Sequence, residues 1–318
     1  MRGPASHRVT PARAAAMRGA MRAAHTSAFA AACLGIALYA VMDAVMKGLV
    51  LAIGAYVALF WRLVAGTLIS GALYALSRPN LPPLTTIRVH FARSLVVAVM
   101  AIAFFWGIGR VPLAEAIALS FIAPLIALAL AAIFLKEQVG IRSVLASLLG
   151  LAGVGVILAG QLGGTHSDET LYGIGAVLLS AVFYAINLVI ARHQAQLAKP
   201  LEIAAFQNLF VLAIFCLPAP LLLRLPELGH LPAIGAAAAL AIVSLLLLSW
   251  AYARAEAQIL ITVEYTAFIW ASLMGWWVFG EKLTLATIAG TILIVAGCLI
   301  AARKQHSGAV PEAEAALS

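Results

Sequence analysis

Charged side chains inside long apolar runs are the residues of this chain that could do chemistry. Asp43, Arg62, Glu115 and Glu264 all interrupt such runs. A charge in the hydrocarbon of a bilayer costs at least about 2.5–3.5 kcal/mol, so it needs a partner or a wet cavity. These residues therefore indicate ion pairing, recognition of a charged solute or proton transfer inside a membrane.

Arg62 and Glu264 are the two opposite charges that lie deepest in the predicted spans. Arg62 lies about nine residues into one span, roughly 14 Å deep, and Glu264 about seven residues into another, roughly 11 Å deep. Both depths approach the middle of a hydrocarbon core about 30 Å thick. One hypothesis is that both face a central cavity, where they pair with each other or bind the charged ends of a zwitterionic or anionic solute. The alternative is a fixed structural ion pair. Glu264 is also a candidate proton carrier.

Uncharged polar and aromatic residues occupy the same depth. The polar set has two interpretations, cavity lining and helix–helix contact, because buried polar groups require partners. Cavity lining is the favoured interpretation for Tyr265 and Trp270, and a proline in mid-span indicates a kink that serves as a hinge or only as shape. The set comprises Tyr39, Tyr184, Asn187, Gln207 and Asn208, the aromatic residues Phe121, Tyr265 and Trp270, and the hinge candidate Pro124.

The remaining ionisable residues are expected near the membrane surfaces. Asp43 and Glu115 lie near Lys47 and Arg110, which favours pairing at the interface over a gate. Glu281 and its repeat counterpart Glu137 are interpreted as boundary charges. All seven histidines are expected in loops, tails or span ends, so a histidine proton relay is not predicted: they are numbers 7, 25, 90, 166, 193, 230 and 306.

The composition places these residues in a membrane protein. The 318 residues are 64% hydrophobic and 10% charged, whereas a soluble domain is about half apolar and a quarter charged. So few charges cannot cover a water-exposed surface, and the long apolar runs predict helices rather than strands. The net charge of +8 does not indicate nucleic-acid binding, because the basic residues lie between apolar runs, where they set topology.

Ten apolar runs of spanning length follow a basic leader, residues 1–26, and precede a polar tail, residues 303–318. With both termini in the cytoplasm, fifteen Lys and Arg residues lie inside and four outside, as the positive-inside rule requires. The predicted spans are 27–46, 53–77, 91–109, 112–135, 143–160, 172–191, 201–223, 232–252, 257–280 and 284–302.

The sequence also contains an internal repeat. Residues 121–158 resemble residues 265–302, with Phe121 matching Tyr265, and Tyr39 matches Tyr184 at nearly the same offset. The halves, 27–160 and 172–302, each hold five predicted spans, so the second enters the membrane inverted. Inverted repeats are typical of secondary transporters, whose halves rock about a central site.

These features resemble the EamA branch of the drug/metabolite transporter superfamily over nearly the whole chain. The motifs are Phe60-Trp61-Arg62, Leu135-Lys136-Glu137 after the Pro124 span, Ala251-Tyr252-Ala253-Arg254, Glu264-Tyr265 and Phe279-Gly280-Glu281. The resemblance implies ten helices, a central cavity and transport of a small metabolite.

The sequence therefore predicts an all-α integral membrane protein, a secondary carrier in a bacterial inner membrane. It contains no phosphate-binding loop, no H-E-x-x-H and no G-x-S-x-G motif, so neither a cofactor nor a metal is expected. The expected partners are a small solute and the lipid bilayer, not nucleic acid, and a homodimer is left open. The rival interpretations are an intramembrane enzyme and a non-transporting channel or scaffold.

The charge argument makes Glu264 testable. Glu264→Gln removes the charge and the titratable proton while keeping the shape, so it should abolish or strongly impair transport without affecting membrane insertion. Flux assays in cells with matched expression measure this. Unaltered transport would remove Glu264 from the mechanism.

Overall fold

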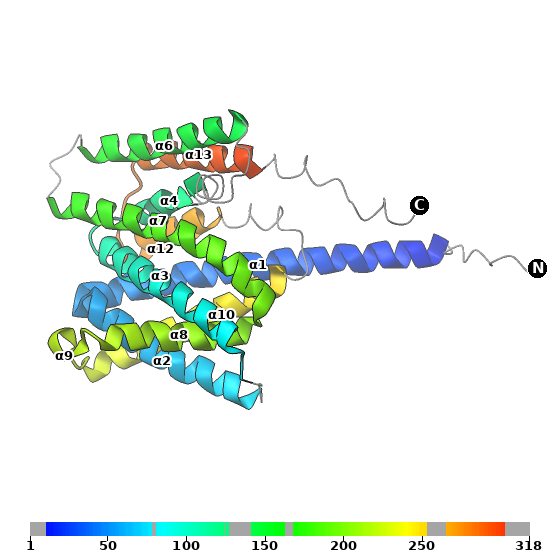
Figure 1. Cartoon of the computed structure of the whole chain (residues 1–318). Coiled ribbons are helices and arrows are strands. Elements are labelled where there is room, and N and C mark those ends of the chain that lie inside the picture. Colours follow the sequence, from blue (N-terminus) through cyan, green and yellow to red (C-terminus); the bar gives the residue numbers. More distant parts are fainter. Residues whose placement is uncertain are drawn as a thin grey trace, which may run out of the picture.

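The computed structural model describes residues 11–77, 81–123, 125–126, 141–162, 168–252 and 265–302, and all its regular elements in these ranges are helices. Figure 1 shows them lying roughly along one direction, with the beginning of α1 projecting from the bundle. The helices are α1 (Pro11–Ile53), α2 (Ala55–Leu76), α3 (Leu84–Ile108), α4 (Leu113–Ser120), α6 (Ile141–Leu162), α7 (Asp168–Leu197), α8 (Pro200–Cys216), α9 (Ala219–Leu222), α10 (Leu231–Tyr252), α12 (Ala267–Phe279) and α13 (Leu285–Ala302), with a short 3₁₀ turn, η1 (Leu228–His230), before α10.

Glycine and proline separate the apolar runs into helices. Gly54 and Gly280 have positive φ angles of 82° and 65°, a conformation that glycine adopts without a steric cost, and they end α1 and α12. Pro83 and Pro112 stand immediately before α3 and α4, where a missing backbone N–H costs little.

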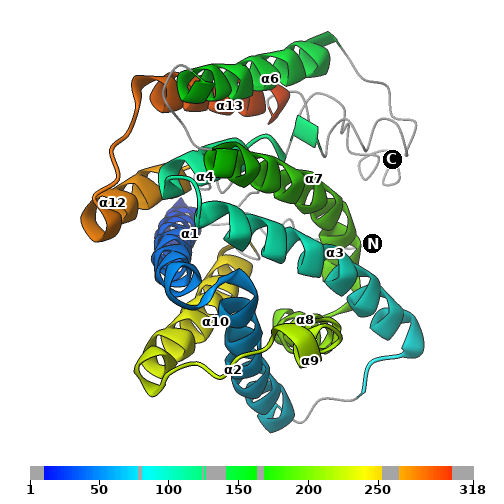
Figure 2. The same cartoon turned by 90° about the vertical axis from the view of Figure 1, so that its left-hand side faces the viewer.

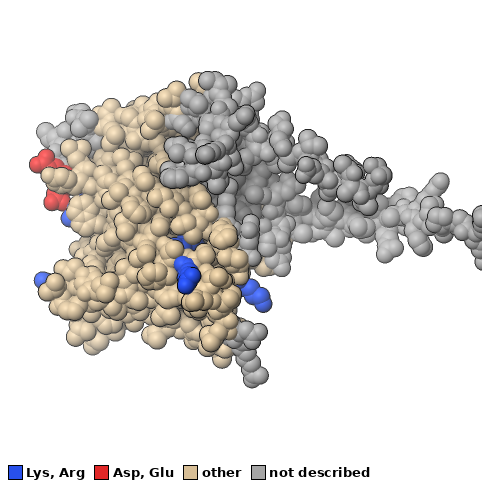
Figure 3. Space-filling model, viewed as in Figure 1, with Lys and Arg blue, Asp and Glu red and all other residues tan. Residues whose placement is uncertain are grey.

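The surface of the bundle is that of a multi-pass membrane protein, which confirms the predicted fold class. Large apolar side chains such as Leu68, Leu148 and Trp276 are 57–69% exposed. Figure 3 shows charged side chains toward the two ends of this face and an uncharged surface between them.

Five helical segments are long and apolar enough to cross a membrane: Phe29–Ile53, Ala55–Leu76, Leu84–Ile108, Asp168–Ala191 and Leu228–Ala251. Shorter apolar helices occupy four further predicted spans, and α4 lies in the remaining one. Predicted spans 112–135 and 257–280 both extend into residues outside the described ranges, so the count of ten crossings stays a prediction.

The helix pairings have the pattern of an inverted repeat. In the predicted repeat, α1 corresponds to α7 and α3 to α10. The pair α1–α10 therefore has its counterpart in the pair α7–α3, and both pairs are extensive. Two more pairs, α2–α8 and α6–α13, each join a helix to its own counterpart, and α4–α12 joins different parts of the corresponding fourth and ninth predicted spans. Figure 2, viewed along the bundle, shows α6–α13 at one edge and α2–α8 at the other. A pseudo-two-fold axis through the centre produces this arrangement.

Counterpart side chains also meet near this axis. Phe121, at the end of α4, and Tyr265, just before α12, pack edge to face with ring centroids 5.4 Å apart. Because these two residues occupy equivalent positions in the two halves, their contact is the one expected of residues beside a two-fold axis.

Glycines allow α6 and α13 to lie close together. A Cβ atom on Gly153 would lie 2.6 Å from the carbonyl oxygen of Gly290, and a Cβ on Gly290 would lie 2.5 Å from that of Gly153. Both distances are too short for a carbon–oxygen contact, so any side chain at either position must push the helices apart.

The third span differs from its prediction. It was expected to begin at residue 91, but α3 begins at Leu84. His90 is therefore not in a connection: it lies in the second turn of α3 and is 1% exposed. Arg93, inside the predicted span, lies one turn further along the same helix. Ile87, His90 and Ser94 recur at helical spacing, and the polar character of this first turn concealed the helix.

Gly153→Ala should destabilise the protein, because the added methyl group collides with the backbone of α13. Overpacking of this kind costs about 1–3 kcal/mol. Gly155, two residues away on the same helix, is the control, since a Cβ there meets nothing within 4 Å. Gly155→Ala should leave stability unchanged or raise it, because alanine is the better helix former. Thermal unfolding of the purified protein measures both, and equal melting temperatures would contradict the close approach.

Candidate functional site

A cluster of polar side chains lies in the middle of the bundle, where α1, α2 and α3 meet. Tyr39 and Asp43 are four residues apart and share one face of α1. Tyr39 interacts electrostatically with Asp43, with Arg62 of α2 and with Arg93 of α3. All four side chains keep part of their surface accessible although they are in mid-helix. The cluster therefore combines two cations, a carboxylate and a phenol at membrane depth.

Arg62 is the least satisfied member of this cluster. Its guanidinium carbon lies 5.8 Å from the centre of the Phe105 ring, over the face of the ring, and Asp43 interacts with it electrostatically. Its Nε atom is buried and has no hydrogen-bond partner among the described residues. A buried polar group without a partner costs about 1–3 kcal/mol, more when it is charged. Arg62 is therefore suited to bind an acceptor that arrives from outside. Its predicted partner, Glu264, lies outside the described residues, as does the hinge candidate Pro124.

Arg93 connects the cluster to the second half of the chain. Its Nε donates a hydrogen bond to Oδ1 of Asn187 on α7, at 2.7 Å, and it interacts electrostatically with Tyr184 of the same helix and with Tyr39. The structure thus brings the repeat counterparts Tyr39 and Tyr184 to one arginine. Sequence reasoning missed Arg93, and its three-residue spacing from His90 was the signal that could have placed both on one helical face.

A chain of hydrogen bonds continues from Arg93 toward one end of the bundle. Nη1 of Arg93 donates to Oε1 of Gln194. Nε2 of Gln194 lies 2.5 Å from Nδ1 of His90, and Nε2 of His90 lies 3.1 Å from Oε1 of Glu202. His90 and Gln194 are each 1% exposed. We call this end, where α7 is followed by α8, the Glu202 end.

The other candidates lie apart from the arginines. Asn208 donates to its own helix at Ala204 and to Ser70 of α2 at 3.4 Å, a placement that favours contact between α2 and α8. Trp270 packs against a separate apolar cluster formed by α1 and α10, with Ala32 in its core. Phe121 and Tyr265 pack against the main core beside the pseudo-two-fold axis.

A second polar cluster closes the opposite end of the bundle, which we call the Lys47 end. Lys47 is 5% exposed and donates to the carbonyl oxygen of Val111, at 2.6 Å, and to Glu281. Glu281 also accepts the backbone N–H of Leu113 at 2.7 Å, and Glu115 acts on Lys47 electrostatically. Glu281 lies at an end of the bundle, as expected of a boundary charge, and its contacts also link α1, α4 and the α12–α13 turn.

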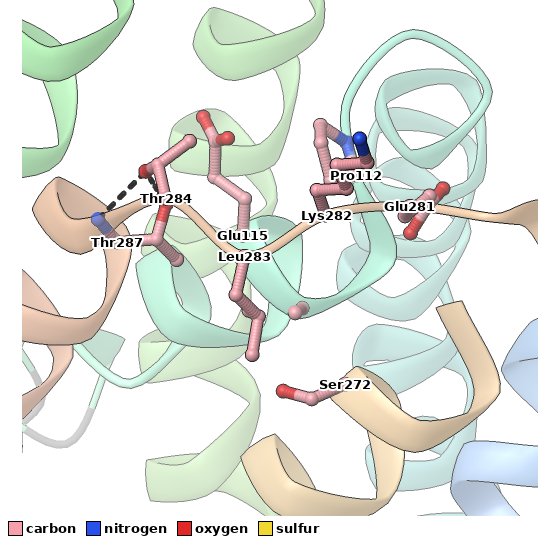
Figure 4. Close-up of a pocket in the computed structure, with 9 residues that line it drawn as sticks. Pro112, Glu115, Ser272, Glu281, Lys282, Leu283, Thr284 and Thr287 are labelled. Carbon is pink, nitrogen blue, oxygen red and sulfur yellow. Dashed lines mark hydrogen bonds between the residues drawn. The ribbon is translucent and has the colours of Figure 1, made fainter. Parts of the chain in front are cut away.

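Figure 4 shows the small cavity that remains at this end, with Glu115, Ser272 and the dashed contact between Thr284 and Thr287 around it. Thr284 accepts the backbone N–H of Thr287 at 3.0 Å and so satisfies the first turn of α13. The cavity volume is about 10 Å³, which is room for about one water molecule. A solute cannot pass through it. Among the residues that the structure describes, no group of three or more His, Cys, Asp or Glu side chains is placed to hold a metal ion.

Comparison with known proteins gives the same picture of the chain. Residues 26–159 and 171–303 each match the model of the EamA-like transporter family. The pseudopaline exporter CntI of Pseudomonas aeruginosa is 29% identical over 280 residues, 83% of this chain and 92% of its own length. An uncharacterized transporter of Helicobacter pylori is 28% identical over 222 residues, 66% of this chain and 72% of its own. One solved crystal structure has a TM-score of 0.58 at 21% identity, covering 90% of this chain and 99% of that one, so it is similar in fold.

Lys47→Met should strongly destabilise the protein, because it leaves Glu281 mostly buried without its cation. Breaking a buried pair on one side costs about 3–5 kcal/mol. The double variant Lys47→Met/Glu281→Met should recover part of that loss, since no uncompensated charge remains. Lys282→Met, a change at the exposed neighbour of Glu281, is the control. Melting temperatures of the four proteins decide, and a double variant no more stable than Lys47→Met would contradict a coupled pair.

Proposed function

The chain belongs to the EamA-like transporter family, and from this premise we propose that it is a secondary carrier of a small zwitterionic or anionic metabolite, working by alternating access. The observation that carries the proposal is Arg62, a mid-membrane guanidinium whose buried Nε lacks a hydrogen-bond partner among the described residues. A buried guanidinium raises the free energy of a membrane protein unless a ligand accepts its hydrogen bonds.

The charges of the central cluster suit a solute that carries a carboxylate. Guanidinium groups bind carboxylates through paired, directional hydrogen bonds. Asp43, which interacts with Arg62, offers a complementary contact for an amine. Tyr39 and Tyr184 supply hydroxyl groups for further polar contacts. Together these groups favour an amino-acid-like or other carboxylate-bearing metabolite over a neutral or purely cationic one.

The helix pairings support alternating access. A chain of two inverted halves can adopt two related shapes, one open to each side, because the halves exchange conformations about the axis between them. Among the described residues, the Lys47 end has a buried ion pair and a cavity of about 10 Å³. A permanently open channel is disfavoured for the same reason.

The proposed setting is the inner membrane of a bacterium, with both termini in the cytoplasm. The Lys47 end then faces outward and the Glu202 end inward, in agreement with the charge bias. The direction we propose is export, because one relative that aligns over most of both chains is named an exporter.

A thermal-stability panel on the purified protein tests the substrate class. A bound ligand at about 100 times its dissociation constant stabilises by roughly 2.7 kcal/mol, so zwitterionic and anionic metabolites should raise the melting temperature while neutral analogues should not. Arg62→Gln should weaken the affinity for the ligand about ten- to a hundredfold, the loss expected for a charged hydrogen bond, and should therefore reduce the rise in melting temperature.

Arg88→Gln, a change at an exposed arginine on α3, is the matched control and should respond like the wild type. Flux of the stabilising compound through reconstituted vesicles should saturate with its concentration. Flux without saturation would favour a channel, and full affinity in Arg62→Gln would remove that residue from the site.

A further inference from the structure

The hydrogen bonds between Arg93, Gln194, His90 and Glu202 determine the protonation of the histidine. Arginine has donors only, so the Gln194 atom that faces Arg93 must be its carbonyl oxygen. The amide nitrogen of Gln194 therefore faces Nδ1 of His90 and donates to it. Nδ1 is consequently unprotonated, and the ring proton is on Nε2, from which it is donated to Glu202. The structure represents the neutral form of His90.

A proton added to His90 must be placed on Nδ1, where it meets the amide N–H of Gln194. Two donors then face each other, and the contact is lost unless the amide of Gln194 turns over. The turned amide accepts from Nδ1 but presents its N–H₂ group to Arg93, which has no acceptor to offer. Arg93 then keeps Asn187 as a partner and loses Gln194.

We propose that His90 is a proton-operated switch that determines whether Gln194 holds Arg93 or releases it toward the central site. With neutral His90, the guanidinium of Arg93 is shared between Asn187 and Gln194. With charged His90, one side of the guanidinium is free to bind a carboxylate near Tyr39 and Tyr184, which already interact with it. The proton comes from water at the Glu202 end, and no other bond is made or broken.

The surroundings of His90 suit this role. Glu202 of α8 faces the ring and compensates the added positive charge. Phe206 of the same helix stacks on the ring with centroids 5.0 Å apart and covers that face of it. From α2, Tyr74 contacts Phe206 edge to face and interacts electrostatically with Glu202. From α7, the facing side chain is the uncharged Gln194, and on α3 itself the nearest charge is Arg93.

The switch also bridges the two halves of the chain. His90 and Arg93 belong to α3 of the first half, whereas Gln194 and Glu202 belong to α7 and α8 of the second. Because the ring is 1% exposed, the Glu202 end must open before a proton arrives. This inference rests on the proposed function for its role in transport. It departs from the prediction of no histidine proton relay, because imidazole is a side chain that can exchange a proton near neutral pH.

The first experiment needs no transported solute. Full-length protein in lipid nanodiscs, labelled with ¹⁵N histidine and ¹⁵N arginine, is titrated from pH 8.5 to pH 5.5 by solid-state NMR. His90→Gln and Arg93→Lys assign the signals. At high pH, His90 should show an unprotonated Nδ1 and a protonated Nε2. As it becomes charged, the Arg93 side-chain signals should shift together with it.

The variant Gln194→Leu separates the two ends of the switch. It should leave the titration of His90 visible while the Arg93 signals no longer follow it. A protonated Nδ1 at pH 8.5, or Arg93 signals that ignore the charging of His90 in the wild type, would overturn the proposal.

The second experiment uses the compound that stabilises the protein in the panel above and measures its half-saturating concentration for transport against pH. The wild type should bind it more tightly at low pH, and His90→Gln, which offers a donor and an acceptor but does not titrate, should lose that dependence. His193→Gln, a change at an exposed histidine on α7, should keep it. Identical pH profiles for all three proteins contradict the switch. If no compound is transported, the proposed function fails, and the NMR titration still decides whether the switch exists.

Discussion

The energetic cost of charge in hydrocarbon is the constraint on which the rest of this structure depends. In the described part of the bundle, two buried cations have partners that offset this cost. Lys47 is matched by Glu281 and by the backbone carbonyl oxygen of Val111, and Arg93 by two side-chain carbonyls on α7. Arg62 differs, because its Nε has no such partner among the described residues. This incomplete guanidinium is the basis of the proposed ligand site.

Each of the satisfied clusters also joins the two halves of the chain. Lys47 of the first half reaches Glu281 of the second, and Arg93 of the first reaches Asn187 and Gln194 of the second. These electrostatic contacts therefore lie across the interface that would move in the proposed alternating access, while the glycines of α6 and α13 hold a close apolar contact at one edge. Motion of the halves must exchange these polar contacts, and this makes them sensitive to solute and to protons.

Much of the fold followed from the sequence, because lipid imposes long apolar helices and the repeat imposes their order. The repeat also identified Tyr39 with Tyr184, and the two tyrosines act on the same arginine. His90 was misplaced, and the role of Arg93 was missed, for a physical reason. Residues after Pro83 are polar enough to read as a loop, yet in the folded chain their polar atoms bond to α7 and α8 rather than to water. No local pattern reports a partner that is 94 or more residues away.

The sequence by itself determined the membrane class, the inverted halves and the residues whose charge demands an explanation, because hydrophobicity and repetition are properties of the chain alone. Only the tertiary structure decided which charges are satisfied. It separated Lys47 and Glu281, which complete each other, from Arg62, and it showed that Arg93 is linked to His90 through Gln194. Hydrogen bonding depends on distance and direction between atoms of different helices, and those are established only when the helices pack.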